Sequence, residues 1–132
     1  MTLDEIENYC LSKAGAFPDH PFGPKFLVIK VKAPSMEKGR IFAQLFILKG
    51  ESRVTLNCDM VSGEFYRGIY PGAVTRGYYC PPIQRPFFNT VALDGTVPDD
   101  VLAEMIDNAY KTVMGKLPKK YRKELEAQTH ET

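Results

Sequence analysis

The chain has 132 residues, of which 44% are hydrophobic and 25% are charged. This composition is typical of a globular protein with a buried core and argues against wholesale disorder. The net charge of +1, from 17 basic and 16 acidic residues, excludes the strongly basic profile of a histone-like protein but leaves room for a local basic surface. We expect one domain over residues 1–128 and a polar tail over 129–132.

Signals for membrane insertion, export and metal binding are missing from the sequence. No apolar run approaches the roughly 18 residues of a membrane-spanning helix, and the acidic N-terminus lacks the basic region of a signal peptide. Three widely spaced cysteines, Cys10, Cys58 and Cys80, are typical of free thiols in a reducing cytosol. We therefore expect a cytosolic protein with no membrane contact, no metal site and no cofactor.

The first half of the chain predicts one helix and three strands. Apolar residues recur at spacings of three and four over 3–14, which indicates an amphipathic helix. Three prolines and a glycine within 17–24 predict a loop. The next three β-branched or alternating segments, separated by short polar turns, predict an antiparallel meander of strands over 26–31, 40–48 and 53–58.

The second half predicts mainly helices. Asp59 is placed to cap a short helix that ends near Gly68, and the Pro- and Gly-rich stretch 69–86 is expected to be a loop. A fourth strand is predicted over 88–93. Two further helices are expected over 98–117 and 118–128.

The order α-β-β-β-α-β-α-α predicts an α+β fold, a two-layer sandwich with an antiparallel sheet of about four strands covered by helices on one face. The longest helix carries an apolar stripe wide enough to need such a sheet as its partner. The residues that we expect it to bury are Val101, Leu102, Met105, Ile106, Ala109 and Val113.

Several short segments, taken together and in order, resemble the MmcQ/YjbR family. The segments are 10–16, 19–24, 39–43, 56–59, 70–72, 77–78, 89–99, 109–110 and 117–122. They span nearly the whole chain. The resemblance implies a small bacterial cytosolic protein with a compact frataxin-like α/β fold, which has been likened to a double-wing motif and on that ground labelled DNA-binding.

The chain departs from the family in the segment before the strand predicted at 88–93. At the positions where members carry His, Asn, Lys and Trp, this sequence has Pro82, Gln84, Arg85 and Phe88. An amide and a cation are therefore kept there, while the imidazole and the indole are lost.

Residues 67–85 carry three arginines and no acidic residue, interleaved with tyrosines. Such a loop suits contact with phosphates and stacking on bases. It equally suits a protein partner or a small ligand, or simply rings that pack the loop onto the sheet beside solvated arginines. The candidate nucleic-acid contacts in this region are Arg67, Arg76, Gln84 and Arg85, and the candidate aromatic surface is Tyr70, Tyr78, Tyr79 and Phe87.

Residues 111–123 contain six basic and no acidic residues, the largest local imbalance of charge in the chain. Clustered cations attract phosphates and release counterions. The alternative is a solvated helix end, where cations complement the helix dipole. The candidate contacts here are Lys116, Lys119, Lys120, Arg122 and Lys123.

No catalytic constellation is evident. Arg76 and Arg85 lie close enough in sequence to lower the pKa of the Cys80 thiol, but nothing places His20 beside that thiol as a base. We therefore expect a monomeric, non-enzymatic protein that binds DNA weakly and without sequence specificity. The alternative is a protein-interaction or small-ligand module that uses the aromatic loop over 66–88.

Overall fold

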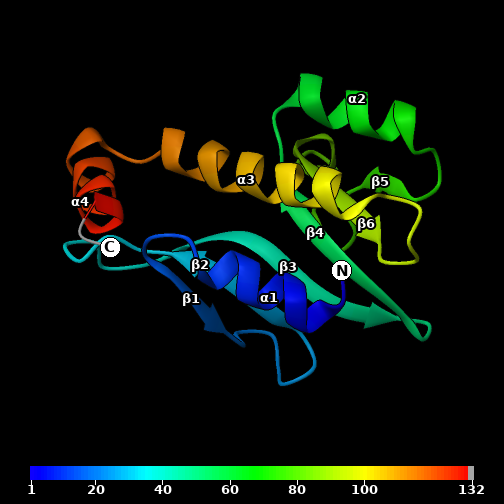
Figure 1. Cartoon of the computed structure of the whole chain (residues 1–132), viewed down its shortest axis with the longest axis horizontal. Coiled ribbons are helices and arrows are strands. Elements are labelled where there is room, and N and C mark those ends of the chain that lie inside the picture. Colours follow the sequence, from blue (N-terminus) through cyan, green and yellow to red (C-terminus); the bar gives the residue numbers. More distant parts are fainter. Residues whose placement is uncertain (131–132) are drawn as a thin grey trace.

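The computed structural model describes residues 1–130, and it confirms the α+β class: four helices pack on a single antiparallel sheet (Figure 1). The helices are α1 (Leu3–Leu11), α2 (Met60–Ile69), α3 (Asp99–Gly115) and α4 (Lys119–His130), with a 3-10 turn η1 (Arg85–Phe87). The strands are β1 (Ala16–Asp19), β2 (Leu27–Val31), β3 (Arg40–Leu48), β4 (Glu51–Asn57), β5 (Val74–Arg76) and β6 (Phe88–Ala92). The tail expected over 129–132 is thus in part the end of α4, and 131–132 lie outside the described residues.

The sheet has six strands in the order β1-β2-β3-β4-β6-β5, two more than expected. Both additional strands lie at its edges, in segments predicted to be loops. The prediction for 17–24 was wrong in its first part, because Pro18 sits in β1 opposite Ile29. An edge strand tolerates a residue without an N–H group. Likewise β5 breaks the loop expected over 69–86, and it is only three residues long.

The core lies between the sheet and the helices, as the apolar stripe of α3 predicted. Five of the six residues expected to be buried there are buried, and Val101 is half-buried. Phe42 of β3 reaches this layer and packs edge-on against Tyr110 of α3, with ring centroids 5.5 Å apart. The stripe and the sheet therefore form one continuous core.

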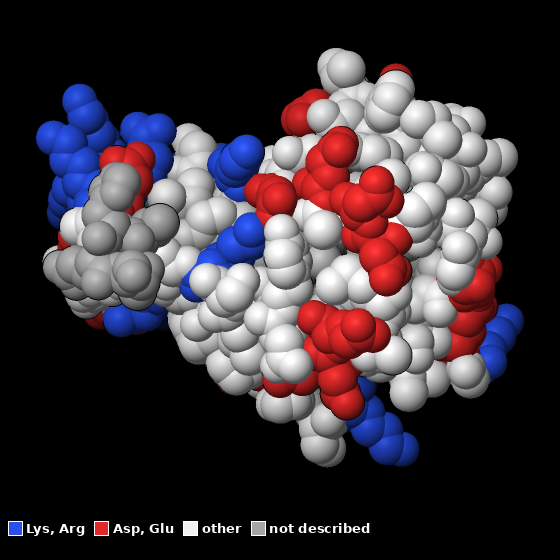
Figure 2. Space-filling model, in the orientation of Figure 1, with Lys and Arg blue, Asp and Glu red and all other residues white. Residues whose placement is uncertain are grey.

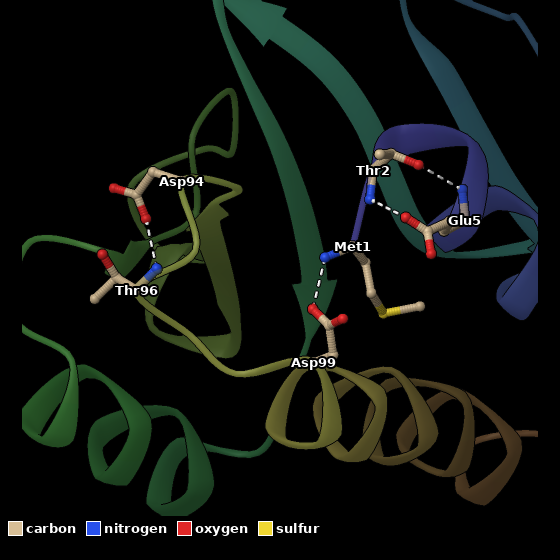
Figure 3. Close-up of polar contacts among 6 residues, drawn as sticks. All are labelled: Met1, Thr2, Glu5, Asp94, Thr96 and Asp99. Atoms are coloured by element: carbon tan, nitrogen blue, oxygen red, sulfur yellow. Dashed lines mark hydrogen bonds and ion pairs between the residues drawn. The ribbon is translucent and has the colours of Figure 1, made fainter.

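Polar contacts are found at the starts of two helices, α1 and α3 (Figure 3). Thr2 and Glu5 form a capping box at the start of α1, each side chain accepting a hydrogen bond from the other residue's backbone N–H. The α-amino group of Met1 lies 2.6 Å from the Asp99 carboxylate at the start of α3. This ion pair joins the beginnings of α1 and α3.

The other face of the sheet is covered by two loops rather than by helices. Thr55 and Thr90 lie on this face, on neighbouring strands, and their hydroxyl oxygens are 2.7 Å apart. One loop, 20–26, precedes β2, and the other, 77–84, follows β5. These two loops position the candidate site.

Candidate functional site

The loop 77–84 is held in place by hydrogen bonds to β6 and to the turn η1. The backbone N–H of Tyr78 donates to the Thr90 hydroxyl at 2.9 Å. Further along, Arg85 Nε donates to the Cys80 carbonyl at 3.1 Å. Between these anchors Tyr79 adopts a φ of 58°, a left-handed conformation that is uncommon for a residue other than glycine. Such strain persists only where the surroundings hold it, and it is concentrated at functional sites.

Tyr79 stands at the centre of an aromatic cluster drawn from both loops and from β3. The rings of Phe26 and Phe46 stack with centroids 5.1 Å apart, and Tyr79 packs edge-on against both, at 5.7 and 5.3 Å. Phe22 packs against Phe26, and Tyr78 packs against Tyr79. Tyr79 and Phe22 nevertheless remain about two-thirds exposed, at 65% and 67%.

Three adjoining hollows of about 780, 390 and 350 Å³ surround this cluster, and Tyr79 lines all three. Three cations also line them, Arg76 and Arg85 in the largest hollow and Lys25 in the second. No Asp or Glu is among the lining residues. We call this surface the aromatic face, defined by Phe22, Lys25, Phe26, Phe46, Arg76, Tyr78, Tyr79 and Arg85.

A further arginine supports the aromatic face from the sheet. The Arg53 guanidinium lies over the Tyr78 ring, 5.5 Å from its centroid, and Nη2 is 3.0 Å from the Glu51 carboxylate. Its Nε is buried and has no hydrogen-bond partner within residues 1–130. Arg53 thus neutralises the nearest carboxylate on β4 and holds Tyr78 in place.

The other loop residues selected from the sequence lie away from the aromatic face. Arg67 turns inward from α2, and its Nη1 donates to Asn89 Oδ1 at 2.7 Å. Tyr70 ends α2 and packs against the core. Gln84 and Phe87 are exposed but line none of the three hollows. Only Arg76, Arg85, Tyr78 and Tyr79 are brought together as one surface.

The basic C-terminal segment lies at the opposite end of the molecule. Figure 1 shows α4 beyond the end of α3, and Figure 2 shows the cations gathered at that end. Glu124 of α4 accepts hydrogen bonds from Ser35 in the β2–β3 connection. In the strand order, β2 and β3 lie toward the β1 edge of the sheet, whereas β5 forms the other edge. The cations at this end are Lys116, Lys119, Lys120, Arg122 and Lys123. They do not form one surface with Arg76 and Arg85.

The three cysteines are free and buried. Burial raises the pKa of the Cys10 thiol to about 12 and that of Cys58 to about 11. Burial likewise raises the pKa of Cys80, and the nearby Arg85 only partly offsets this effect. Cys80 is therefore not an activated thiolate, because a nucleophilic cysteine needs a lowered pKa and access to solvent.

The described part of the chain, residues 1–130, contains no cluster of metal ligands and no helix that could span a membrane. No three His, Cys, Asp or Glu side chains in this range group closely enough to hold a metal ion. None of the helices in it is long and apolar enough to span a bilayer.

Comparison with known proteins supports the resemblance noted in the sequence. A family model described as YjbR matches residues 11–112, which is most of the chain. The chain belongs to the YjbR family. A relative named "Uncharacterized protein YjbR", from Escherichia coli strain K12, is 26% identical over 123 residues, which cover 93% of this chain and 96% of the relative.

Two solved structures have the same fold as this YjbR-family chain, one with clear sequence similarity to it and one with little. Protein DR2400 of Deinococcus radiodurans, described as a DUF419 domain, has a TM-score of 0.83 and 32% identity, covering 95% of this chain and 88% of that one. A Pseudomonas syringae protein has a TM-score of 0.67 at 16% identity, covering 85% and 98%. The second likeness concerns the fold alone.

Half of the aromatic face was not identified from the sequence. Phe22, Lys25 and Phe26 lie in or next to the loop predicted at 17–24, and Phe46 was assigned to a strand. The sequence signal that could have indicated these residues is the pair of phenylalanines beside three prolines and a lysine, because large aromatic side chains are uncommon in a solvated loop. Their meeting with Tyr79, more than 50 positions away in sequence, depends on tertiary structure.

Proposed function

We propose that this protein binds single-stranded nucleic acid on the aromatic face, in a non-enzymatic role in the cytosol. The observation that carries the proposal is the composition of the three hollows around Tyr79, which combine five aromatic rings with three cations and contain no carboxylate. Rings that accept bases and cations that accept phosphates are what sequence-tolerant binding of a single strand requires.

Each part of the aromatic face has a distinct task. The exposed ring of Tyr79 offers a surface on which a base stacks, which is worth about 1–3 kcal/mol per base in single-strand-binding proteins. Arg76 and Arg85, both exposed at the edge of the largest hollow, suit phosphate oxygens. The hydrogen-bonded loop 77–84 and the packing of Tyr79 on Phe46 fix the rings before a ligand binds. Little side-chain freedom is therefore lost on binding.

A single strand fits this surface better than a duplex. The faces of paired bases are hidden within a duplex, so stacking on Tyr79 is available only to unpaired bases. The basic segment of α4 is too remote from Arg76 and Arg85 to extend the same contact (Figure 1). With few cations and no helix placed to read base edges, we expect weak, non-specific binding, with a Kd of about 10⁻⁴–10⁻⁶ M at physiological salt.

The largest hollow supports a second candidate, a small planar anion such as a mononucleotide. Its volume of about 780 Å³ lies within the range of ligand pockets, and it is lined by Tyr78, Tyr79, Arg76 and Arg85. Such a ligand would fill this hollow and leave the one around Phe22 and Lys25 empty. The two candidates differ in how affinity depends on the length of the oligonucleotide: it should increase with length for a single strand and not for a mononucleotide.

The test is a fluorescence anisotropy titration with fluorescein-labelled dT20, at about 50 and 200 mM salt. We expect Tyr79→Ala to weaken binding about tenfold and Tyr79→Phe to preserve it. Arg76→Ala combined with Arg85→Ala should weaken binding and lower the salt slope by up to about 1.4, since single strands contribute about 0.7 per phosphate.

Controls use the remote basic segment and other nucleic acids. Lys119→Ala combined with Lys120→Ala removes an equal charge from α4 and should leave the affinity for dT20 nearly unchanged. A labelled duplex should bind more weakly than dT20. No binding at 50 µM protein in low salt, or equal loss from both double variants, would contradict the proposal. Competition by a mononucleotide as strong as that by dT20 would favour the small anion instead.

A further inference from the structure

The outward half of α2 is apolar although nothing in the described chain covers it. Val61, Phe65 and Ile69 follow one another at intervals of four, so they share one face of the helix. They are 79%, 59% and 50% exposed, and Met60 next to them is also exposed. The one charged residue on this half of the helix is Glu64, which is also exposed.

The inward half of α2 accounts for how the helix is attached. Tyr66 is buried there, and its hydroxyl donates to the Glu104 carboxylate of α3. Gly63 lies so close to the Cys58 and Arg67 side chains that a Cβ would be 2.8 Å from Cys58 Sγ and 2.9 Å from Arg67 Nη1. The inner side thus supplies the buried contacts of the helix, while Phe65 only packs edge-on against Tyr66 and keeps more than half of its surface exposed.

Gly68 is a second and independent observation on the same outward half. It is exposed, its φ is not left-handed, and a Cβ placed on it would meet no atom within 4 Å. Neither backbone conformation nor internal packing therefore requires a glycine here, although glycine weakens a helix. A glycine in this setting fits the close approach of an outside backbone across the helix.

The surroundings of the apolar strip are acidic. Figure 2 shows a largely white surface over α2 with carboxylates at its border and over the first half of α3, while the cations lie toward α4. Glu64 lies within α2, and Asp59 at its cap also accepts hydrogen bonds from Ser62. On α3, Asp100 and Glu104 are exposed, and Glu104 also accepts from Tyr66. Arg67, the one cation of α2, is bound inward to Asn89.

We propose that the outward half of α2 is a docking surface for an amphipathic helix of another protein, one whose apolar stripe is flanked by lysines or arginines. The partner's stripe packs on Val61, Phe65 and Ile69, and its backbone crosses α2 at Gly68. Its flanking cations face Asp59, Glu64 and the carboxylates of α3. This surface is separate from the aromatic face, and the inference does not depend on the proposed function.

Charge decides against a second copy of this chain as the occupant. Two copies paired through α2 about a twofold axis at Phe65, the middle of the strip, would bring their Glu64 carboxylates close together. Like charges brought together at an interface are unfavourable, whereas a basic partner turns the same groups into attractive contacts. The length of the strip, nine residues from Val61 to Ile69, matches two to three turns of a partner helix.

The test uses a fluorescein-labelled 18-residue peptide with leucines at helical spacing on one face and lysines on the other positions. Two matched peptides control for charge and pattern, one with glutamates in place of the lysines and one with the same composition in scrambled order. We expect the basic amphipathic peptide to bind at least about tenfold more tightly than either control by anisotropy.

Variants of the protein separate docking on α2 from general attraction to its acidic surface. Val61→Ser, Phe65→Ser and Gly68→Leu should each weaken peptide binding at least about fivefold, and Glu64→Lys should weaken it further. Ile47→Ser, which removes an equally exposed aliphatic group from β3, should leave it unchanged. Because all these side chains are exposed, circular dichroism should show the fold retained.

Three results would overturn the inference. Equal binding of the acidic and basic peptides would exclude the complementarity of charge. Peptide binding that is indifferent to Phe65→Ser and Gly68→Leu would place the contact elsewhere. A dimer in sedimentation velocity that dissociates on Phe65→Ser would show that a second copy occupies the surface.

Discussion

The Thr90 hydroxyl lies 2.7 Å from the Thr55 hydroxyl, and both side chains are buried in the sheet face that carries the aromatic loops. The same Thr90 oxygen accepts the backbone N–H of Tyr78 at 2.9 Å. This threonine pair is therefore the anchor that connects the sheet to Tyr79. The same hydroxyl group therefore contributes both to the stability of the sheet and to the position of Tyr78 and Tyr79 on the aromatic face.

Replacing Thr90 with valine should loosen that anchor. Thr90→Val keeps the shape but leaves the Tyr78 N–H without its acceptor, so we expect a loss of about 1–3 kcal/mol in the free energy of unfolding. The affinity for dT20 should fall with it. Thr55→Val is the matched control, because Thr90 still accepts from Tyr78 in that variant. Equal effects of the two substitutions on dT20 binding would contradict this account.

The two glycines of α2 should respond in opposite ways to alanine. Gly63→Ala should destabilise the protein by about 1–3 kcal/mol, because its Cβ would collide with Cys58 Sγ and Arg67 Nη1. Gly68→Ala meets open space and should stabilise it by about 0.5–1 kcal/mol through better helix propensity. Urea denaturation measures both. A loss of stability in Gly68→Ala would show that this glycine has an internal role.

Alkaline pH should weaken the fold through its buried thiols. An unfolded cysteine ionises near pH 9, whereas burial raises the pKa of folded Cys10 to about 12 and that of Cys58 to about 11. The stabilisation from keeping these thiols neutral is thus complete below about pH 9 and declines as the pH rises toward the folded values. Between pH 9 and 10 each thiol should lower the free energy of unfolding by up to about 1.4 kcal/mol.

The check is urea denaturation at pH 7, 9 and 9.5. It stops below the ordinary tyrosine pKa of 10.0, above which Tyr66, whose pKa burial and the Glu104 contact raise to about 12, would add its own pH dependence. Cys10→Ala lowers stability at every pH but should reduce the slope with pH by roughly a third, because Cys58 and Cys80 still contribute. In the native protein at pH 8 all three thiols should react slowly with a thiol reagent, and in denaturant all three should react at once. An unchanged slope in Cys10→Ala would count against burial as the cause.

Asp107 should supply part of the stability that is lost in acid. Burial raises the pKa of its carboxyl group, but the hydrogen bonds donated by Lys13 and Tyr9 together outweigh burial and hold the pKa below its ordinary value. The stabilisation is present above about pH 4 and is lost as the pH falls through the folded value. Asp107→Asn should therefore destabilise the protein by about 1–2 kcal/mol at pH 7.

Thermal unfolding of wild type and Asp107→Asn from pH 7 to pH 2.5 measures this contribution. The two proteins should converge in stability as the pH falls through the lowered pKa of Asp107, where the wild-type carboxyl group also becomes neutral. A constant difference over the whole range would mean that the substitution acts through packing rather than charge.

The elements that were predicted correctly are those whose signal is local. The stripe from Val101 to Val113 specifies α3 because a helix brings those residues to one face whatever surrounds it. β1 and β5 were missed because they are strands only through pairing with β2 and β6. Pro18 argued against β1, and three residues give β5 too little pattern to detect.

In the candidate site, too, the residues with a local sequence pattern could be selected in advance, and those that depend on tertiary contacts could not. Tyr79, Arg76 and Arg85, which the structure brings together, were selected because aromatic and basic residues alternate within one segment of sequence. Phe46 was missed because its ring meets Tyr79 only after the strands have paired. Arg67 was selected with them, but the structure binds its guanidinium to the buried Asn89, and an arginine of this kind has the same sequence signature as one that faces solvent.

The positions of β1 and β5 at the two ends of the sheet also govern how the protein behaves at high concentration. An exposed strand edge is a template on which another chain can add a strand, the first step toward fibrils. Here one edge carries Pro18, which offers no N–H group, and the other is three residues long. The chain thus presents little backbone for growth by strand addition, and self-assembly into cross-β aggregates is discouraged at both sides of the molecule.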